Sequence, residues 1–366
     1  MNIPQGYKQT ELGIIPEDWE VKPIGECLSI GNGCDYKDKP FGNIPVYGTG
    51  GVITYINDYL YDGQTICIGR KGTINKPLYY EGKIWTVYYT YNFIDVDVKY
   101  IYYLLLTIDW MSLNEATGVP SLTSDRIRHI LLALPPVAEQ RAIAEALSDI
   151  DGLIAALDKK IAKKRLIKQG AMQQLLTGKK RLPGFSGPWM ERKLGAISHI
   201  KTGSCNGDQA VDNGKYPFFV RSQKVYAIDS YSYDGEAILV PGEGGIGSIF
   251  HYINGKFDYH QRVYKISDFA DNVCGKYIFF YMSRYFGEYA LSLTVKATVD
   301  SLRLPTFEEF VICMPLNIEE QQAIATILND MDKEIDDLEA QRDKYRLLKS
   351  GMMQKLLTGQ IRLKIK

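Results

Sequence analysis

The sequence predicts an α+β protein with two globular domains, each followed by a long helix, and with the two helices packed as an antiparallel coiled coil. Three observations support this fold class. The segment "GAMQQLLTG" at 170–178 returns as "GMMQKLLTG" at 351–359. The residues before each copy have the apolar period of a long helix. The remaining segments are rich in tyrosine, isoleucine and valine, with glycine and asparagine between them, which is typical of strands and turns.

Composition narrows the class of protein. The 366 residues carry 43 basic and 43 acidic side chains, so the formal net charge is zero and only a local basic patch could bind nucleic acid. We expect a cytoplasmic protein, because no apolar run reaches the roughly 18 residues of a membrane helix and no secretory signal opens the chain. The six cysteines form no C-x-x-C pair, so we expect reduced thiols and no metal site.

The duplication extends beyond the opening motif and sets the expected domain boundaries. At the same separation in sequence as the two copies of that motif, "EQ" at 139–140 returns at 320–321, and "RL" at 181–182 returns at 362–363. Fainter matches join "DWEVKPIGECLSIGNG" at 18–33 to "PWMERKLGAISHIKTG" at 188–203. We therefore expect internal pseudo-two-fold symmetry and four segments: a globular domain at 1–136, a long helix at 137–180, a second globular domain at 181–315 and a second helix at 316–366.

Each long helix is predicted by its own apolar stripe. Apolar residues recur in steps of three and four, as in a coiled coil, at Ile143, Leu147, Ile150, Ile154, Leu157 and Ile161, and at Ile324, Leu328, Met331, Ile335 and Leu338. Each helix begins after a proline-containing segment and ends near a "TG" pair, where Gly178 or Gly359 is a natural C-terminal cap. The other helix is the simplest cover for each stripe, and a partner protein is the alternative.

The globular segments predict strands and short helices. The strands are expected at "KIWTVYYTYNFIDV" and "KFDYHQRVYKI", and the short helices at "YIYYLLLTIDW" and "YIFFYMSRYFG". We expect each domain to be a compact α+β unit around a strongly bent sheet.

Catalytic motifs do not explain this chain. "GEGGIG" at 242–247 fits the dinucleotide fingerprint, but a β-like segment follows it where that fingerprint requires a helix, so a tight loop between strands is the better interpretation. The sequence has no phosphate loop, H-E-x-x-H helix or G-x-S-x-G elbow, and its four histidines form no recognisable set. We expect no cofactor.

Polar loops in equivalent places of both domains offer groups that read DNA. Arginine pairs with a guanine edge, asparagine with adenine and lysine with phosphate. The candidates are Arg70, Lys71, Thr73, Asn75 and Lys76 in the first domain, and Arg221, Ser222, Gln223, Lys224, Glu243, Ser248, His260, Gln261, Arg262, Lys296 and Thr298 in the second. The alternative for each is an ordinary solvated surface residue. A basic run on the first helix, at 159–168, is either a solvated face or a contact to DNA or to an acidic partner.

Taken together, these segments resemble the specificity subunits of Type I restriction–modification systems over essentially the whole chain. The opening "GYKQTELGIIPEDWEVKPIGE" looks like their usual start. "LPPVAEQRAIA" and "MPLNIEEQQAIA", each leading into a helix that ends "QQLLTG" or "QKLLTG", look like their two repeated helical regions.

The resemblance implies a non-catalytic subunit. Each globular domain would be a target recognition domain that reads one half of a split DNA sequence, and the antiparallel helices would act as a ruler between the half-sites. Two adenine methyltransferase subunits would dock on the assembly, and nuclease–translocase subunits can join. The repeated helical regions would hold the partner through Gln140, Ile143, Leu175, Leu176, Gln321, Ile324, Leu356 and Leu357. Because the candidate readers differ between the domains, we expect an asymmetric target. A coiled-coil adaptor with protein- or glycan-binding domains is the alternative function.

Overall fold

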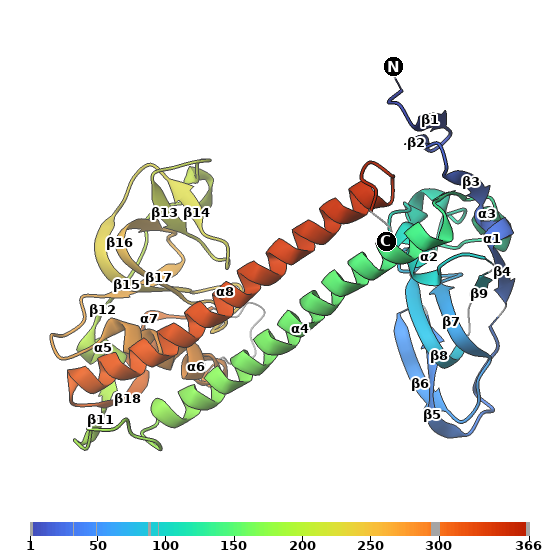
Figure 1. Cartoon of the computed structure of the whole chain (residues 1–366). Helices are drawn as coiled ribbons and strands as arrows, with labels where there is room; N and C mark the ends of the chain where they lie inside the picture. Colours follow the sequence, from blue (N-terminus) through green and yellow to red (C-terminus); the bar gives the residue numbers. More distant parts are fainter. Residues whose placement is uncertain are drawn as a thin grey trace. The chain divides into compact units, whose positions relative to one another are not determined.

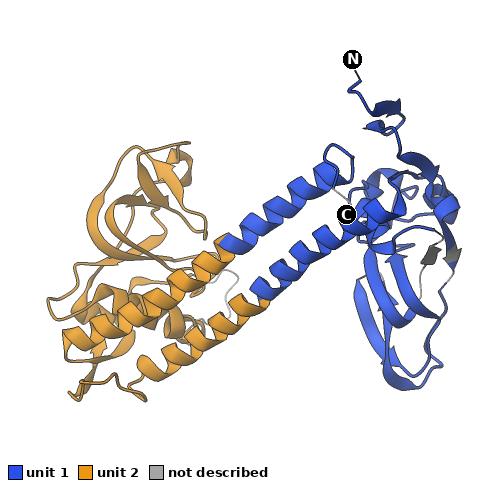
Figure 2. Ribbon diagram, in the orientation of Figure 1, with its two compact units in different colours: residues 1–158, 341–366 blue, residues 159–340 orange. Residues whose placement is uncertain are grey.

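The computed structural model describes residues 3–363 apart from residues 32, 49, 87–88, 94 and 294–300. Two of the predicted DNA readers, Lys296 and Thr298, lie outside the described residues. The chain forms two compact units (Figure 2). Unit 1 consists of Met1–Asp158 with Gln341–Lys366, and unit 2 of Lys159–Ala340. The domain boundaries expected from the sequence follow chain order, whereas each compact unit combines a globular domain with parts of both long helices.

Unit 1 is built on a six-stranded sheet. Its strands lie in the order β4-β9-β7-β8-β5-β6, with ranges Leu28–Gly31, Tyr89–Phe93, Tyr61–Ile68, Leu78–Thr86, Phe41–Gly48 and Gly51–Ile56. A hairpin and a second small sheet accompany it, made by β1 (Tyr7–Thr10) with β2 (Gly13–Pro16) and by β3 (Glu20–Pro23) with β10 (Leu131–Leu134). The helices of the domain are α1 (Ile24–Cys27), α2 (Val98–Leu105), η1 (Trp110–Leu113) and α3 (Ser124–Arg128).

Unit 2 repeats the six-stranded sheet and the small two-stranded sheet of unit 1, and among the described residues it has no counterpart of the β1–β2 hairpin (Figure 1). Its sheet has the order β12-β17-β15-β16-β13-β14, with ranges His199–Thr202, Val263–Ser267, Tyr233–Pro241, His251–Tyr259, Tyr216–Phe219 and Tyr226–Ile228. The small sheet pairs β11 (Trp189–Lys193) with β18 (Val311–Pro315), and the helices are α5 (Leu194–Ile197), η2 (Gly207–Gln209), α6 (Gly275–Leu293) and α7 (Leu304–Glu308). In both sheets the pairs are antiparallel except one, β5 with β8 and β13 with β16.

The two long helices have the same length and the same ending. The helix α4 spans Val137–Leu175 and α8 spans Ile318–Leu356, 39 residues each. Beyond each end a glycine has a left-handed backbone, with φ of 67° at Gly178 and 68° at Gly359. Glycine adopts this conformation without the steric cost that a Cβ atom brings, so the predicted C-terminal caps are confirmed.

Within each unit, ion pairs join a segment of α4 to a segment of α8 that runs in the opposite direction. In unit 2, Lys164 pairs with Glu334 at 2.7 Å and Lys168 pairs with Asp332. In unit 1, Lys349 of α8 pairs with Asp151 of α4 at 2.7 Å. Arg346 of α8 also pairs with Asp158 of α4 at 3.5 Å, so the partner number falls as the residue number rises from Arg346 to Lys349 and from Lys164 to Lys168, and the segments of each unit run antiparallel. Arg165 pairs with Glu339 as well, so three of the six basic residues at 159–168 bind α8.

Only part of each apolar stripe is covered by the other long helix, which the sequence predicted as its simplest cover. Their ends pack into the domain cores: Ile143 and Leu147 of α4 belong to the core of unit 1, and Ile324 and Leu328 of α8 belong to that of unit 2. The stripe of each helix therefore covers a globular domain as well as the other helix. Over the described residues, no helix has the length and apolarity that crossing a bilayer would require.

Candidate nucleic-acid interface

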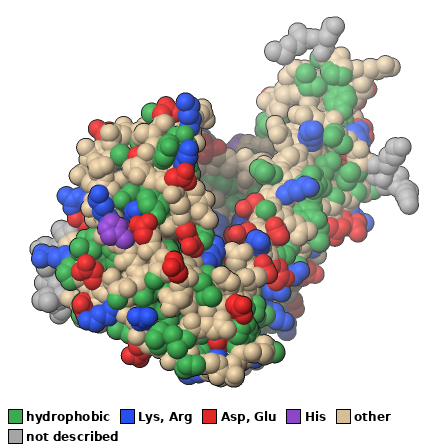
Figure 3. All heavy atoms as spheres, turned by 90° about the vertical axis from the view of Figure 1, so that its left-hand side faces the viewer, with side chains coloured by type: hydrophobic (Ala, Val, Ile, Leu, Met, Phe, Trp, Pro, Cys, Tyr) green, Lys and Arg blue, Asp and Glu red, His purple; other side chains and the backbone are tan. Residues whose placement is uncertain are grey.

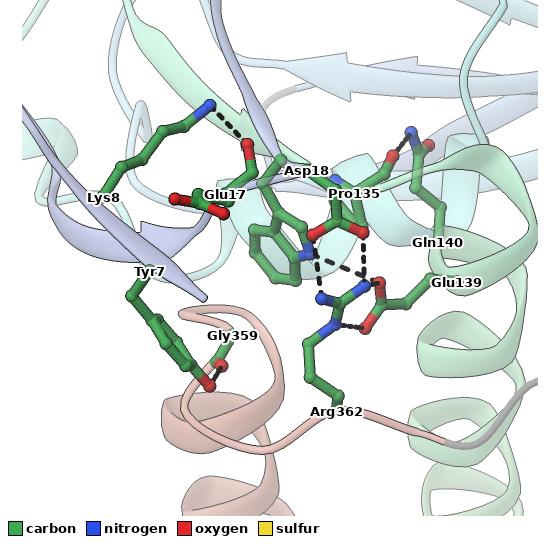
Figure 4. A network of polar contacts seen from close by, with 10 residues as sticks. Tyr7, Lys8, Glu17, Asp18, Pro135, Glu139, Gln140, Gly359 and Arg362 are labelled. Atoms are coloured by element: carbon green, nitrogen blue, oxygen red, sulfur yellow. Dashed lines mark hydrogen bonds and ion pairs between the residues drawn. The ribbon is translucent and has the colours of Figure 1, made fainter. Parts of the chain in front are cut away.

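Each unit has one junction where a globular domain meets both long helices. In unit 1, Glu139 lies fully buried in the first turn of α4 and accepts three hydrogen bonds (Figure 4). Two come from Arg362, which follows α8, at 2.7 and 2.6 Å, and one from the indole N–H of Trp19 at 3.2 Å. Arg362 also binds Asp18, at 2.8 Å for both oxygens. The guanidinium lowers the pKa of the Asp18 carboxyl.

Unit 2 has the equivalent junction with one hydrogen bond fewer. Glu320, in the first turn of α8, is 1% exposed and accepts from Arg181 at 2.6 and 2.7 Å. The Arg181 guanidinium lies 5.7 Å from the ring centre of Trp189. The indole N–H of Trp189 is buried and has no hydrogen-bond partner among the described residues. Trp19 and Trp189 therefore occupy matching places, but only Trp19 binds the carboxylate.

The glutamine that follows each buried glutamate ties the helix to its domain. The side chain of Gln140 accepts from the backbone N–H of Asp97 at 2.9 Å and donates to the carbonyl of Pro135 at 2.8 Å. The side chain of Gln321 accepts from the backbone N–H of Cys274 at 2.9 Å and donates to the carbonyl of Pro315 at 2.9 Å. The duplicated "EQ" pair is thus a structural joint in both copies.

The predicted partner-binding residues lie in these junctions and in the domain cores. All eight side chains are buried inside the chain, each with an exposed fraction of 6% or less: Gln140, Ile143, Leu175, Leu176, Gln321, Ile324, Leu356 and Leu357. The four leucines pack into the domain cores, those of α4 in unit 2 and those of α8 in unit 1. A partner has no access to them in this structure. The "LLTG" motif occurs twice because each globular domain binds the end of one long helix.

The polar loop of unit 1 lies at the end of β7. The backbone of Arg70 accepts from the N–H of Leu122 at 3.0 Å, and Lys71 forms a bridge with Ser121, so the "VPSL" segment holds the loop. Ile74 is fully buried and anchors its middle. The predicted readers that surround this anchor are all exposed: Arg70, Lys71, Thr73, Asn75 and Lys76. Several polar groups are therefore presented together on a fixed backbone.

Unit 2 places its loop in the same way but with different residues. The carbonyl of Gly242 accepts from the N–H of Leu302 at 2.7 Å, and Glu243 forms a bridge with Ser301. Glu243 therefore occupies the position that Lys71 has in unit 1. The loop leads directly from β15 to β16, as the strand-to-strand interpretation of "GEGGIG" predicted.

Glu243 gathers two arginines that are distant in the sequence. Its carboxylate pairs with Arg221 at 3.3 Å and with Arg262. Beside them lies a cavity of about 310 Å³ lined in part by Arg221, Tyr226 and His260. The backbone N–H of Arg262 donates to Nδ1 of His260 at 3.0 Å. Burial, together with the two arginines, lowers the pKa of His260, so the ring is neutral at pH 7 and accepts this bond.

The remaining predicted readers of unit 2 have mixed roles. Gln261 binds the side chain of Asn206 at 2.8 Å beside the cluster, while Gln223 and Lys224 are exposed. The hydroxyls of Ser222 and Ser248 donate to backbone carbonyls of their own turns, at 3.0 and 2.7 Å. The sequence did not predict Asn206 or Tyr226 at this site, although the turn signal "NG" at 206–207 marks a polar loop.

One face of the molecule carries no single sign of charge (Figure 3). On the face of the molecule that Figure 3 shows, basic and acidic side chains are interspersed. This agrees with the zero net charge of the chain, and this face offers DNA no broad basic field. Among the residues that the structure describes, no three metal-binding side chains come together.

The duplicated domains, the joining helices and the polar loops define a two-domain recognition subunit. The family model of the Type I restriction modification DNA specificity domain matches residues 16–164 and again residues 187–345. The chain therefore belongs to this family, as a Type I specificity subunit with two DNA recognition domains. Such a subunit is non-catalytic, since catalysis lies in other subunits of the system. The alternative of a protein- or glycan-binding adaptor is set aside.

Relatives of similar length support the assignment. The chain is 26% identical to the putative type I restriction enzyme MjaX specificity subunit and 25% identical to the MjaVIII specificity subunit, both of Methanocaldococcus jannaschii, over 98% of this chain and 97% of each relative. The crystal structure of the S subunit from M. genitalium has the same fold, with a TM-score of 0.76 at 14% identity over 97% of this chain and 98% of that one.

Proposed function

We propose that unit 1 and unit 2 each read one half of an asymmetric, bipartite DNA target, in a complex with adenine methyltransferase subunits. The observation that carries this proposal is the pair of equivalent loops. The same backbone pairing, Lys71 with Ser121 and Glu243 with Ser301, holds loops of different side chains. A constant scaffold with variable contacts is what two readers of different bases require.

The side chains suggest what each loop contacts. In unit 1, Arg70 and Asn75 are of the residue types that bind guanine and adenine edges, and Lys71 and Lys76 suit phosphates. In unit 2, Glu243 holds Arg221 and Arg262 together and lowers the local positive charge. A bare phosphate contact does not need such a carboxylate, so this cluster is better suited to base edges than to the DNA backbone.

The long helices are the proposed ruler between the half-sites. Each is 39 residues long, which corresponds to about 58 Å at about 1.5 Å per residue. The partners are proposed from the family and from a solved relative. A structure titled for complex assembly and conformational transition of the type I R-M system matches this chain with a TM-score of 0.53 over 95% of its length.

Mapping methylated adenines in the host genome, with and without this gene, tests the proposal. One split motif should lose its methylation on deletion, and the motif would give both half-sites and the spacer. If every methylated motif survives deletion in a strain that expresses the methyltransferase, the proposal is wrong.

Single substitutions then separate the two readers. Arg70→Ala should relax the first half-site alone, and Arg262→Ala the second alone, each at a cost of about 1–3 kcal/mol at one base pair. Swapping one globular domain for that of a relative should change one half-site only. An equal loss on every DNA sequence would instead assign the arginine to a phosphate.

A further inference from the structure

Three connections of the unit 2 sheet bring one carboxylate and two guanidinium groups together. Arg221 follows β13, Glu243 follows β15, and Arg262 lies between β16 and β17. Nη1 of Arg221 lies 3.3 Å from one oxygen of the Glu243 carboxylate, and Nη1 of Arg262 binds the other oxygen. The carboxylate, which only accepts hydrogen bonds, is therefore flanked by two groups that only donate them.

Hydrogen bonds between the three connections fix the backbone of this cluster. The N–H of Gly242, next to Glu243, donates to the carbonyl of Arg262 at 2.8 Å. His260 accepts from the N–H of Arg262 through Nδ1, and its own backbone N–H donates to the carbonyl of Phe219 at 2.9 Å. The backbone of Arg262 is thus held through both its N–H and its carbonyl group. Such support keeps a recognition site in one geometry before the ligand arrives.

The arginine side chains can turn toward a ligand more easily than the carboxylate can. The side chains of Arg221 and Arg262 are 50% and 53% exposed, whereas that of Glu243 is 22% exposed. Ion pairs made by such exposed side chains contribute little free energy, so a guanidinium can reorient at small cost. A guanidinium has five N–H donors, and a single contact with a carboxylate uses only part of this capacity.

The carboxylate determines which base edge the cluster can bind. It pairs with an amino group and repels the acceptors O6 and N7 of guanine and O4 of thymine. In the major groove, a G·C pair presents two acceptors on guanine beside the amino donor of cytosine. An arginine next to a glutamate matches this order. The purine of an A·T pair presents only one acceptor there, so arginine cannot bind it through two hydrogen bonds.

The equivalent loop of unit 1 has the opposite charge at this place. Lys71 occupies the backbone position of Glu243, as the matching bridges to Ser121 and Ser301 show. Lysine only donates hydrogen bonds, so this position of unit 1 suits base acceptors or phosphate groups. A contact to an amino group is therefore specific to unit 2 at this loop position.

We propose that this cluster reads one G·C base pair, with Glu243 accepting from the amino group of cytosine and Arg262 donating to O6 and N7 of guanine. Arg221 holds the carboxylate in place. The inference rests on the proposed function, in which unit 2 reads one half-site. Glu243 determines specificity, because its carboxylate rejects guanine and thymine at the position of the cytosine.

The test combines changes in the DNA with changes in the protein. The complex of the full chain with the host's adenine methyltransferase subunits is titrated with duplexes that carry the mapped motif. The half-site of unit 2 is the one that changes when the second globular domain is swapped. In that half-site, each cytosine in turn is replaced by 2-pyrimidinone, which lacks the amino group. Each guanine in turn is replaced by 7-deazaguanine, which lacks N7.

For the wild type, loss of the amino group at one cytosine should weaken binding at least about fivefold, and so should loss of N7 at its paired guanine. Glu243→Ala should bind equally with and without that amino group, and Arg262→Ala should abolish the effect of the guanine change. The matched control is Glu309→Ala, since Glu309 also forms an ion pair on unit 2, with Lys193, and should leave both effects unchanged. An unchanged response of Glu243→Ala to changes in the first half-site shows that the variant is folded.

Three results would overturn this inference and leave the proposed function intact. The wild type could read its motif but lose no affinity with any cytosine change. The amino group could matter equally in the wild type and in Glu243→Ala, which would assign the contact to another residue. Removal of the amino group of an adenine could be the change that Glu243→Ala masks, which would make adenine the base that Glu243 reads. If the wild-type complex recognises no split motif, the proposed function itself fails.

Discussion

Replacing Arg362 by alanine should lower the free energy of opening of unit 1 by about 3 kcal/mol. Removing one member of a buried ion pair costs about 3–5 kcal/mol, because a charge remains buried without its partner. Glu139 is fully buried, so this range applies. The indole N–H of Trp19 still donates to the carboxylate, which places the cost at the lower end of the range. Arg181→Ala should cost about 5 kcal/mol in unit 2, since among the described residues no indole donor replaces the guanidinium at Glu320.

Hydrogen exchange on the full chain is the suitable assay, because a chain with two units has no single unfolding free energy. The slowest amides of α2 report on unit 1 and those of α6 on unit 2. Arg362→Ala should accelerate the first group about 100-fold and leave the second unchanged. The double variant Glu139→Gln/Arg362→Ala should be more stable than Arg362→Ala alone by at least about 1 kcal/mol, since a neutral amide costs less than a carboxylate to leave buried without a partner. Unchanged exchange in unit 1, or a milder effect of Arg181→Ala in unit 2, would refute this reasoning.

Three further predictions concern recognition, pH and spacing. Glu243→Gln removes the carboxylate shared by Arg221 and Arg262, so binding to unrelated DNA should tighten. The slope of the logarithm of the binding constant against the logarithm of the salt concentration should steepen by about one, and an unchanged slope in a salt titration would contradict this. Burial lowers the pKa values of His251 and His260, so their stabilisation of unit 2 is present above the ordinary value near pH 6.5 and is lost as pH falls from there through the lower folded-state pKa values. The protection factors of the α6 amides, which are corrected for the pH dependence of intrinsic exchange, should therefore fall between pH 7 and pH 5.5, and unchanged protection factors would contradict this. Four residues inserted into α4, about one turn, should change the spacer of the methylated motif or abolish binding, and an unchanged motif would remove the helices as a ruler.

The helices were predictable because their signal is long and local. A stripe that repeats over 39 residues fixes both the element and its ends, and the glycine caps need only a few neighbouring residues. The sheet order was not predictable in the same way. The parallel pair β5 with β8 and its copy β13 with β16 join strands that other strands separate in the chain, and local propensity carries no information about such pairing.

The candidate site shows the same division between local and distant information. The loops at Arg70 and Glu243 were predictable because glycines and polar residues interrupt strand-like segments. The meeting of Arg221, Glu243 and Arg262 was not, since three separate connections supply them. The repeated leucines at 175–176 and 356–357 were assigned to a partner because an apolar repeat does not reveal whether its cover belongs to the same chain.

The discontinuity of unit 1 has a consequence for synthesis on the ribosome. Residues 341–366 complete unit 1, yet residues 159–340 must be translated first. At about 5–20 residues per second, the first globular domain waits about 10–35 s for the helix end that covers Trp19. During this interval the nascent chain exposes an unfinished core, and the end of α8 from another, completed copy has the right shape to occupy it. Exchange of helix ends between neighbouring chains on one polysome is therefore the characteristic misfolding risk of this architecture.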